Sequence, residues 1–193
     1  MIVVDYGVGN LFSVVKALQH VGASVQTSVR AEDIASADAV VLPGVGAFAD
    51  GMKGLAQRGL VEPLRGFAQS GRPLLGLCLG MQLLFEESSE FGLHAGLGLV
   101  PGKVVAIAHE PGLKIPHIGW AKLQRSGDTV YFVHSFVAQP SDPSVVSDTV
   151  SFGSQQLCAA IAKNNVLGYQ FHPEKSGEAG LCMLKAFVTR LGP

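Results

Sequence analysis

The sequence has few charged residues. Asp, Glu, Lys and Arg make up 15% of its 193 residues, and the formal net charge is -1. Soluble domains usually carry roughly 25% charged residues. The near-neutral balance argues against a nucleic-acid groove or an anionic membrane surface as the partner. A weakly charged surface also suggests that another protein covers part of it, although a chain rich in Ala and Gly has the same composition.

Cysteine is scarce as well. Cys78, Cys158 and Cys182 form no C-x-x-C pair, which argues against a disulfide framework and against a zinc site. The N-terminus lacks a basic stretch, and no apolar run approaches the length needed to span a membrane. We therefore expect residues 1–193 to form one domain, without a metal, in the reducing cytoplasm.

Nucleotide-binding signatures are missing or incomplete. Gly7 and Gly9 follow an apolar run and precede a helical pattern, as in a dinucleotide-binding loop, but the third glycine of that fingerprint is replaced by Phe12. No phosphate-binding loop of the G-x-x-x-x-G-K-[ST] type occurs. We therefore expect no nucleotide cofactor, and no other cofactor is indicated.

The first half of the chain alternates between two hydrophobic periods. Apolar runs at 2–4, 25–27 and 39–42 predict strands, and helical spacing predicts helices at 11–21, capped by Asn10, and at 32–37. This β-α-β-α-β pattern predicts an α/β fold: a doubly wound, mainly parallel, flavodoxin-like sheet with helices on both faces. Function is expected in the loops after the strands, at residues 5–10 and 43–48 and around Cys78.

The second half predicts a different arrangement. Short segments divided by Gly, Pro, Ser and Asp indicate mostly antiparallel strands at 104–108, 121–124, 129–133, 146–152 and 157–162. A strand at 167–171 and an amphipathic helix follow. The apolar face of that helix is predicted to consist of Leu181, Leu184, Phe187, Val188 and Leu191.

A cysteine stands where a buried strand is predicted to turn into a helix. Residues 73–77 form the strand, Cys78 the turn, and Gly76 and Gly80 flank it in a G-x-C-x-G pattern. This spacing is typical of a nucleophile elbow, whose tight turn leaves no room for neighbouring side chains. Backbone N–H groups at the helix start favour a thiolate and can stabilise an oxyanion. Alone, the pattern fits a buried structural cysteine equally well.

A base and an orienting acid follow a later strand. His172 ends the strand predicted at 167–171, Pro173 favours an extended conformation there, and Glu174 can project to the same side. Four of the other histidines are expected on a helix or in irregular segments: His20, His94, His109 and His117. Together with the elbow, the pattern predicts a catalytic triad of Cys78, His172 and Glu174.

The two motifs resemble those of a known family. Gly76-Leu77-Cys78-Leu79-Gly80-Met81-Gln82 and Phe171-His172-Pro173-Glu174 resemble class I (triad) glutamine amidotransferases. Within this family, the loops at 5–11 and 43–48 and the segment at 132–135 resemble the glutaminase subunit of imidazole glycerol phosphate synthase. The resemblance spans essentially the whole chain. Ala121 departs from it, since asparagine is expected at this position.

The resemblance implies that Cys78 attacks the carboxamide of glutamine, that His172 protonates the departing ammonia, and that a glutamyl thioester is hydrolysed to glutamate. The oxyanion would be held by the N–H of Leu79 and by the peptide of Val45 or Gly46. The residues expected to bind the substrate are Gly44, Gln82, His134, Ser135 and Phe136. For His134, a purely structural role in a strand is equally compatible with the sequence.

A partner is implied because free ammonia would be protonated and lost, and we expect no second domain in this chain that could use it. By resemblance, the partner is a (βα)8-barrel cyclase that makes imidazole glycerol phosphate and aminoimidazole carboxamide ribotide in histidine biosynthesis, as the other half of a heterodimer. The docking face is predicted at the carboxyl ends of the strands. Its expected residues are Asn10, Trp120, Tyr131 and Lys175.

The sequence leaves three alternatives open. The first is the glutaminase subunit of another synthase, such as the pyridoxal phosphate synthase type, which shares the triad but not the loop at 5–10. The second is a non-enzymatic flavodoxin-like interaction subunit, which the intact Cys78, His172 and Glu174 disfavour. The third is a cysteine hydrolase or peptidase, which gives no obvious reason for Gln82 or for a partner.

Overall fold

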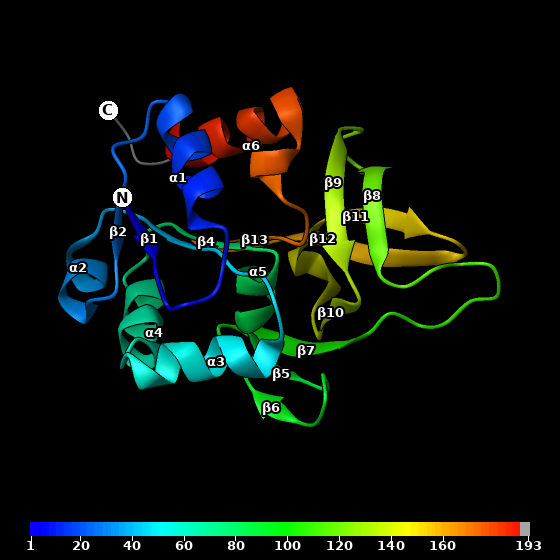
Figure 1. Cartoon of the computed structure of the whole chain (residues 1–193), viewed down its shortest axis with the longest axis horizontal. Coiled ribbons are helices and arrows are strands. Elements are labelled where there is room, and N and C mark those ends of the chain that lie inside the picture. Colours follow the sequence, from blue (N-terminus) through cyan, green and yellow to red (C-terminus); the bar gives the residue numbers. More distant parts are fainter. Residues whose placement is uncertain (190–193) are drawn as a thin grey trace.

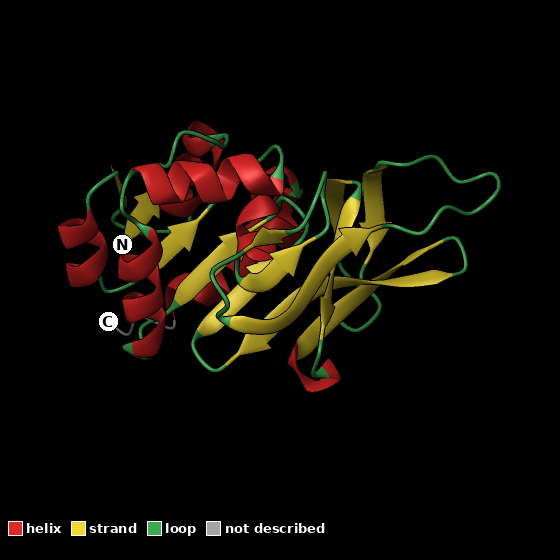
Figure 2. Ribbon diagram, turned by 90° about the horizontal axis from the view of Figure 1, so that it is seen from below, coloured by secondary structure: helices red, strands yellow, loops and turns green. Residues whose placement is uncertain are grey.

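A long mixed sheet forms the centre of the molecule (Figures 1 and 2). The computed structural model describes residues 1–189. No helix among these residues is both long and apolar enough to cross a membrane. The central sheet contains, in spatial order, β11 (Val146–Phe152), β12 (Gln155–Lys163), β13 (Val166–Tyr169), β4 (Leu74–Leu77), β3 (Val40–Leu42), β1 (Ile2–Val4) and β2 (Gln26–Ser28).

The central sheet is parallel from β2 to β13 and becomes antiparallel at β12 and β11. The chain passes from β1 to β2 on one side and then to β3 on the other side. The predicted doubly wound sheet with an antiparallel extension is therefore confirmed. The carboxyl ends of β1, β3, β4 and β13 meet at one edge, where open α/β sheets bind their ligands.

Helices cover both faces of the sheet because its buried strands are apolar on both sides. Val3 packs with α1 (Leu11–His20) and α6 (Gly177–Thr189), whereas Val4 points into the opposite cluster. The helices on that second face are α2 (Ala31–Ser36), α3 (Phe48–Gln57), α4 (Val61–Gln69) and α5 (Leu79–Leu83). Of these, α3 and α4 are absent from the sequence prediction.

Two smaller sheets extend the core. One has four strands in the order β10 (Phe136–Pro140), β7 (Val100–Ala106), β5 (Phe85–Ser88) and β6 (His94–Ala95). The other is the hairpin of β8 (His117–Lys122) and β9 (Thr129–His134), which projects beside α6 in Figure 1. The remaining elements are the 3-10 turns η1 (Pro143–Val145) and η2 (Pro173–Lys175).

Several sequence predictions need correction in this region. The strand predicted at 146–152 is confirmed as β11, but β5, β6 and β10 were not predicted. His94 lies in β6, and His117 begins β8 opposite His134, so the prediction of irregular segments for these two histidines is wrong. The predicted strand at 167–171 ends earlier, at Tyr169. Leu191, predicted on the last helix, lies outside the described residues.

Candidate active site

The turn between β4 and α5 has the strained geometry of a nucleophile elbow. Cys78 has φ 52° and ψ -109°, a conformation that non-glycine residues rarely adopt. Its N–H donates a hydrogen bond of 2.7 Å to the carbonyl oxygen of Tyr169 on the neighbouring strand β13. This bond, together with α5 directly afterwards, holds Cys78 at the edge of the sheet, and its side chain reaches the pocket described below.

Close packing explains both glycines of the elbow. A Cβ on Gly80 would overlap the carbonyl oxygen of Leu42 at the end of β3. A Cβ on Gly76 would lie 2.7 Å from the carbonyl oxygen of Gly80, closer than real Cβ atoms come. The G-x-C-x-G spacing is therefore required by the contact of α5 with β3 and β4, as the elbow interpretation predicts.

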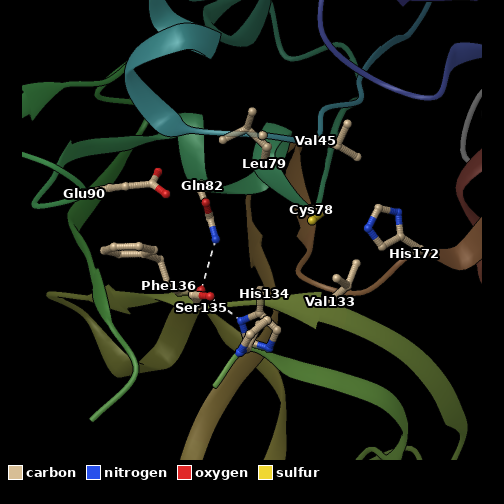
Figure 3. A pocket seen from close by; sticks show the side chains of 12 residues that line it. Val45, Cys78, Leu79, Gln82, Glu90, Val133, His134, Ser135, Phe136 and His172 are labelled. Carbon is tan, nitrogen blue, oxygen red and sulfur yellow. Dashed lines mark hydrogen bonds between the residues drawn. The ribbon is translucent and has the colours of Figure 1, made fainter. Parts of the chain in front are cut away.

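His172 and Glu174 form a buried pair after β13. His172 Nδ1 lies 2.8 Å from Glu174 Oε1, and the two side chains are 4% and 2% exposed. The contact is made by the 3-10 turn η2 rather than by the continued extended chain that the sequence suggested. With Nδ1 engaged, Nε2 is left to face the sulfur of Cys78 across the pocket (Figure 3). The predicted triad residues are thus brought together.

The environment of His172 favours its protonated form. Burial lowers the pKa of this imidazole, but interactions with Cys78 and with the Glu174 carboxylate outweigh burial and raise it to about 9. At neutral pH His172 therefore carries a proton that it can give to a leaving group.

Ser176 fixes the segment that carries the base. Its hydroxyl donates to the carbonyl oxygen of His172 at 2.6 Å and accepts from the N–H of Tyr131 on β9 at 3.0 Å. The N–H of His172 also donates to the carbonyl oxygen of Tyr131, at 2.9 Å. Ser176 is 2% exposed and was not singled out from the sequence, because no local motif reveals a contact with β9.

A pocket of about 260 Å³ opens in front of Cys78 (Figure 3). Its size suits a small polar ligand, and its walls come from the elbow, the glycine loop before α3, the β9–β10 connection and the end of β13. Within the described residues, no group of three or more His, Cys, Asp or Glu could hold a metal. The lining residues are Val45, Gly46, Cys78, Leu79, Gln82, Glu90, Pro116, Val133, His134, Ser135, Phe136 and His172.

Glu90 is a pocket residue that the sequence prediction missed. Its Oε2 accepts a hydrogen bond of 2.6 Å from the N–H of Phe48 at the start of α3, and its carboxylate is turned toward the pocket (Figure 3). Glu90 lies in the loop after β5, a strand that was itself not predicted. Only the packing of this loop against α3 brings the carboxylate to the site.

The glycine loop after β3 occupies the place where an oxyanion would be stabilised. The N–H of Leu79 donates to the carbonyl oxygen of Gly44 at 3.3 Å, so one expected oxyanion donor is engaged. The next N–H along the chain belongs to Val45, in the same peptide as that carbonyl. Gly44 itself is not part of the pocket wall but lies behind it, where a Cβ would overlap the Tyr6 hydroxyl.

Tyr6 anchors this loop. Its hydroxyl donates a hydrogen bond of 2.6 Å to the carbonyl oxygen of Pro43, and its side chain is 1% exposed. Burial, followed by the charge of Cys78, raises the pKa of Tyr6, which therefore remains a hydrogen-bond donor. The loop at residues 5–10 thus supports the loop at 43–48, although the sequence predicted only that both lie at the same sheet edge.

His134 lines the pocket, but its ring nitrogens bind neighbouring protein groups, so it orients the pocket backbone and is not placed as an acid or base. Its Nδ1 lies 2.9 Å from the carbonyl oxygen of Phe136, which can only accept, so the Nδ1 carries the proton. Its Nε2 then accepts from His117 Nδ1 at 3.0 Å. Burial lowers the pKa of His134 to about 4, which keeps it neutral. The structural role considered for His134 is therefore the one that the geometry favours.

The residues expected to meet a partner lie on connected elements. Asn10 caps α1, which contacts η2; η2 contacts β9, and β9 pairs with β8. Asn10, Trp120 and Lys175 are exposed, and Tyr131 is half-buried with its ring centroid 6.0 Å from that of Trp120. These four residues thus lie on elements that follow one another in contact: α1, η2, β9 and β8.

Comparison with known proteins assigns the chain to a class. The family model "Glutamine amidotransferase class-I" matches residues 2–191. In the solved structures, a chain described as "glutamine amidotransferase" has a TM-score of 0.79 at 21% identity and covers 100% of this chain and 99% of its own. PurLQS from Thermotoga maritima has a TM-score of 0.73 at 20% identity, covering 98% and 97%. The chain belongs to the class I glutamine amidotransferase family.

The sequence relatives narrow the class further. The imidazole glycerol phosphate synthase subunit HisH 1 of Legionella pneumophila (strain Lens) is 47% identical over 96% of this chain and 97% of the relative. The HisH subunit of Syntrophotalea carbinolica is 48% identical over 97% and 98%. The HisH subunit of Acaryochloris marina is 47% identical over 98% and 94%. Of the functions considered from the sequence, this similarity favours the glutaminase subunit of imidazole glycerol phosphate synthase.

Proposed function

We propose that this chain is the glutaminase subunit of an imidazole glycerol phosphate synthase and that it supplies ammonia for histidine biosynthesis. The observation that carries the proposal is the buried His172–Glu174 pair facing Cys78 at the mouth of a pocket of about 260 Å³. An elbow cysteine, a base and an orienting acid form the constellation needed for covalent amide hydrolysis. The similarity to HisH subunits over nearly the full chain supports the choice of synthase.

The geometry suggests how glutamine is hydrolysed. Cys78 Sγ attacks the carboxamide carbon, a C–S bond forms, and the carbonyl electrons move to oxygen. When the C–N bond breaks, His172 gives its proton to the departing nitrogen, and a glutamyl thioester and ammonia result. Water then attacks the thioester while His172 takes its proton, which releases glutamate and restores the cysteine. Glu174 holds the imidazole in position throughout.

Charge places the substrate in the pocket. The Glu90 carboxylate is the acidic side chain in its wall, so it suits the ammonium group of glutamine. Gln82, on the first turn of the elbow helix, reaches the polar part of the substrate, and the backbone of Ser135 and Phe136 forms the opposite wall. Glutamine then lies with its carboxamide toward Cys78.

The oxyanion site requires a movement of the glycine loop. Rotation of the Gly44–Val45 peptide would withdraw the Gly44 carbonyl from Leu79 and turn the Val45 N–H toward the substrate oxygen. Two donors would then meet the oxyanion. Gly46, with φ 105°, gives the loop a conformation that other residues rarely adopt. We propose that docking of the partner favours the rotated form and so activates the enzyme.

The partner is a (βα)8-barrel cyclase, with which the chain forms a heterodimer in the cytoplasm. Its docking face is formed by Asn10, Trp120, Tyr131 and Lys175, on elements that border the pocket. Trp120 is 58% exposed, an unusual exposure for the largest apolar side chain, and it suits an interface anchor. Ammonia passing directly into the cyclase would avoid protonation in water.

Purified chain combined with the barrel cyclase of histidine biosynthesis tests this proposal. Glutamine-dependent formation of imidazole glycerol phosphate is expected with wild type and not with Cys78→Ala, which loses its nucleophile but little core volume. The Cys78→Ala complex should still use added ammonia. Transfer of ammonia to a pyridoxal phosphate synthase instead, or full glutamine turnover by folded Cys78→Ala, would refute the proposal.

A further inference from the structure

Gln170 is a buried polar residue next to Cys78. It has no role in the mechanism proposed above. It is 0% exposed and lies between the end of β13 and His172. Its Nε2 is 3.8 Å from Cys78 Sγ, and its Oε1 accepts from Gln82 Nε2 at 3.0 Å. The side chain therefore connects the nucleophile to a residue of the glutamine pocket.

The carbonyl oxygen of Phe136 determines how the side-chain amides of Gln82 and Gln170 are oriented. Gln82 Nε2 lies 3.1 Å from the carbonyl oxygen of Phe136, which can only accept a hydrogen bond, so the amide nitrogen of Gln82 must face it. The same nitrogen faces Gln170, which must therefore present its oxygen. The other end of the Gln170 amide, turned toward Cys78, is then the N–H donor.

The chain of donors also determines what Gln82 can offer to a ligand. Both amide hydrogens of Gln82 are taken, one by Phe136 and one by Gln170. Gln82 can therefore meet a bound molecule only with Oε1, as an acceptor. Without Gln170, one of these hydrogens loses its partner and the amide of Gln82 can rotate.

We infer that Gln170 is a positioning residue, which donates to the sulfur of Cys78 and holds the Gln82 amide with its oxygen toward glutamine. The inference rests on the proposed function and extends it. An N–H donor aimed at the sulfur stabilises a negative charge there and restricts the rotation of the side chain. The nucleophile and the substrate-binding amide are thereby set by the same side chain.

The test measures the reactivity of Cys78 without glutamine. Iodoacetamide alkylation of the Cys78 peptide is followed by mass spectrometry, with the exposed Cys182 as an internal reference. In Gln170→Met, of similar size but without an amide, Cys78 alkylation should slow roughly 10- to 100-fold, the effect of losing a hydrogen bond to a charged group. Gln156→Met, at an exposed position, is the matched control and should react as wild type.

Steady-state kinetics distinguish the contact of Gln170 with Cys78 from its contact with Gln82. Gln170→Glu keeps an oxygen for Gln82 but, at high pH, has no proton to give to Sγ, so kcat should fall while KM stays within about twofold. Gln170→Met should change both. Combining Gln170→Met with Gln82→Met should cost less than the two single losses together, because both act through one contact.

A structural role alone predicts the opposite. Looser packing around Cys78 would speed its alkylation, so a faster or unchanged rate in folded Gln170→Met would overturn the inference. Should Gln170→Met fail to fold, Cys78 alkylation is measured in Gln170→Glu at high pH. A faster or unchanged rate there would likewise overturn the inference. Active Cys78→Ala would overturn the proposed function instead, whereas inactive Cys78→Ala with normal Gln170 variants would overturn only the role of Gln170.

Discussion

On one side of the pocket, the catalytic groups are in place: His172 and Glu174 are 2.8 Å apart, and the imidazole faces Cys78. On the other side, the N–H of Leu79 is occupied by the Gly44 carbonyl oxygen at 3.3 Å. The first side is built from strand ends and a buried ion pair, whereas the second depends on a single peptide in a loop. The difference supports the proposal that oxyanion stabilisation, rather than assembly of the triad, controls activity.

Removing the base should have the largest effect. His172→Ala is expected to lower glutamine turnover by roughly 10⁴-fold or more, and Glu174→Gln by less, since the base matters more than its orientation. Turnover is measured in complex with the cyclase, and thermal unfolding confirms the fold. An active His172→Ala together with an inactive His134→Ala would transfer the role of base to His134.

The pH dependence of stability tests the assembled side directly. The pKa of His172 is raised from its ordinary 6.5 to about 9, so its stabilising proton is fully present below pH 6.5 and is lost as pH rises through 9. The free energy of unfolding should decrease over this range by on the order of a few kcal/mol relative to His172→Gln. Urea unfolding of both proteins between pH 6 and 10 measures it. The same dependence of unfolding free energy on pH in wild type and His172→Gln would contradict the raised pKa of His172.

Loss of Trp120 should weaken the partner complex. Trp120→Ala removes a 58% exposed aromatic side chain and is expected to reduce affinity for the cyclase by roughly 30-fold, a typical interface hot-spot value. Lys175→Ala should have a smaller effect that shrinks at high salt. Calorimetric titration measures both, with Phe91→Ala, at another exposed aromatic residue, as control. Unchanged affinity and activation in both variants would exclude this docking face.

The smallest expected effect concerns the support of the glycine loop. Tyr6→Phe removes the hydroxyl that donates to Pro43 at 2.6 Å and should lower the free energy of unfolding by about 1 kcal/mol. Tyr131→Phe, a half-buried tyrosine on β9, serves as the control in the isolated chain. Equal unfolding midpoints for wild type and Tyr6→Phe would show that this hydrogen bond does not stabilise the loop.

The residues predicted from local sequence motifs lie together in the structure. The elbow depends on three residues within five positions, and His172 is two residues from Glu174, so spacing alone brought out both. Even there, the contact between His172 and Glu174 is made by a 3-10 turn and not by an extended chain. Strands β1, β3 and β4 could be predicted because each is a short apolar run.

The remainder depends on contacts between distant segments. His117 and His134 are seventeen residues apart and meet only through the pairing of β8 with β9. Glu90 reaches the pocket through its contact with α3, an unpredicted helix. Gln170 stands only two residues from His172, but its partners, Cys78 and Gln82, are 92 and 88 positions away. No local pattern marks such contacts.

Control of activity by the Gly44–Val45 peptide is tested most directly by measuring Cys78 alkylation and glutamine turnover in parallel. Both are measured in the isolated chain, with the cyclase, and with the cyclase and its ligand. Alkylation needs no oxyanion donors, whereas hydrolysis does. The isolated chain should therefore alkylate readily at Cys78 but turn over glutamine poorly, and the liganded cyclase should raise turnover with little change in alkylation. Full turnover by the isolated chain, or activation that rises in step with Cys78 reactivity, would contradict control by the Gly44–Val45 peptide.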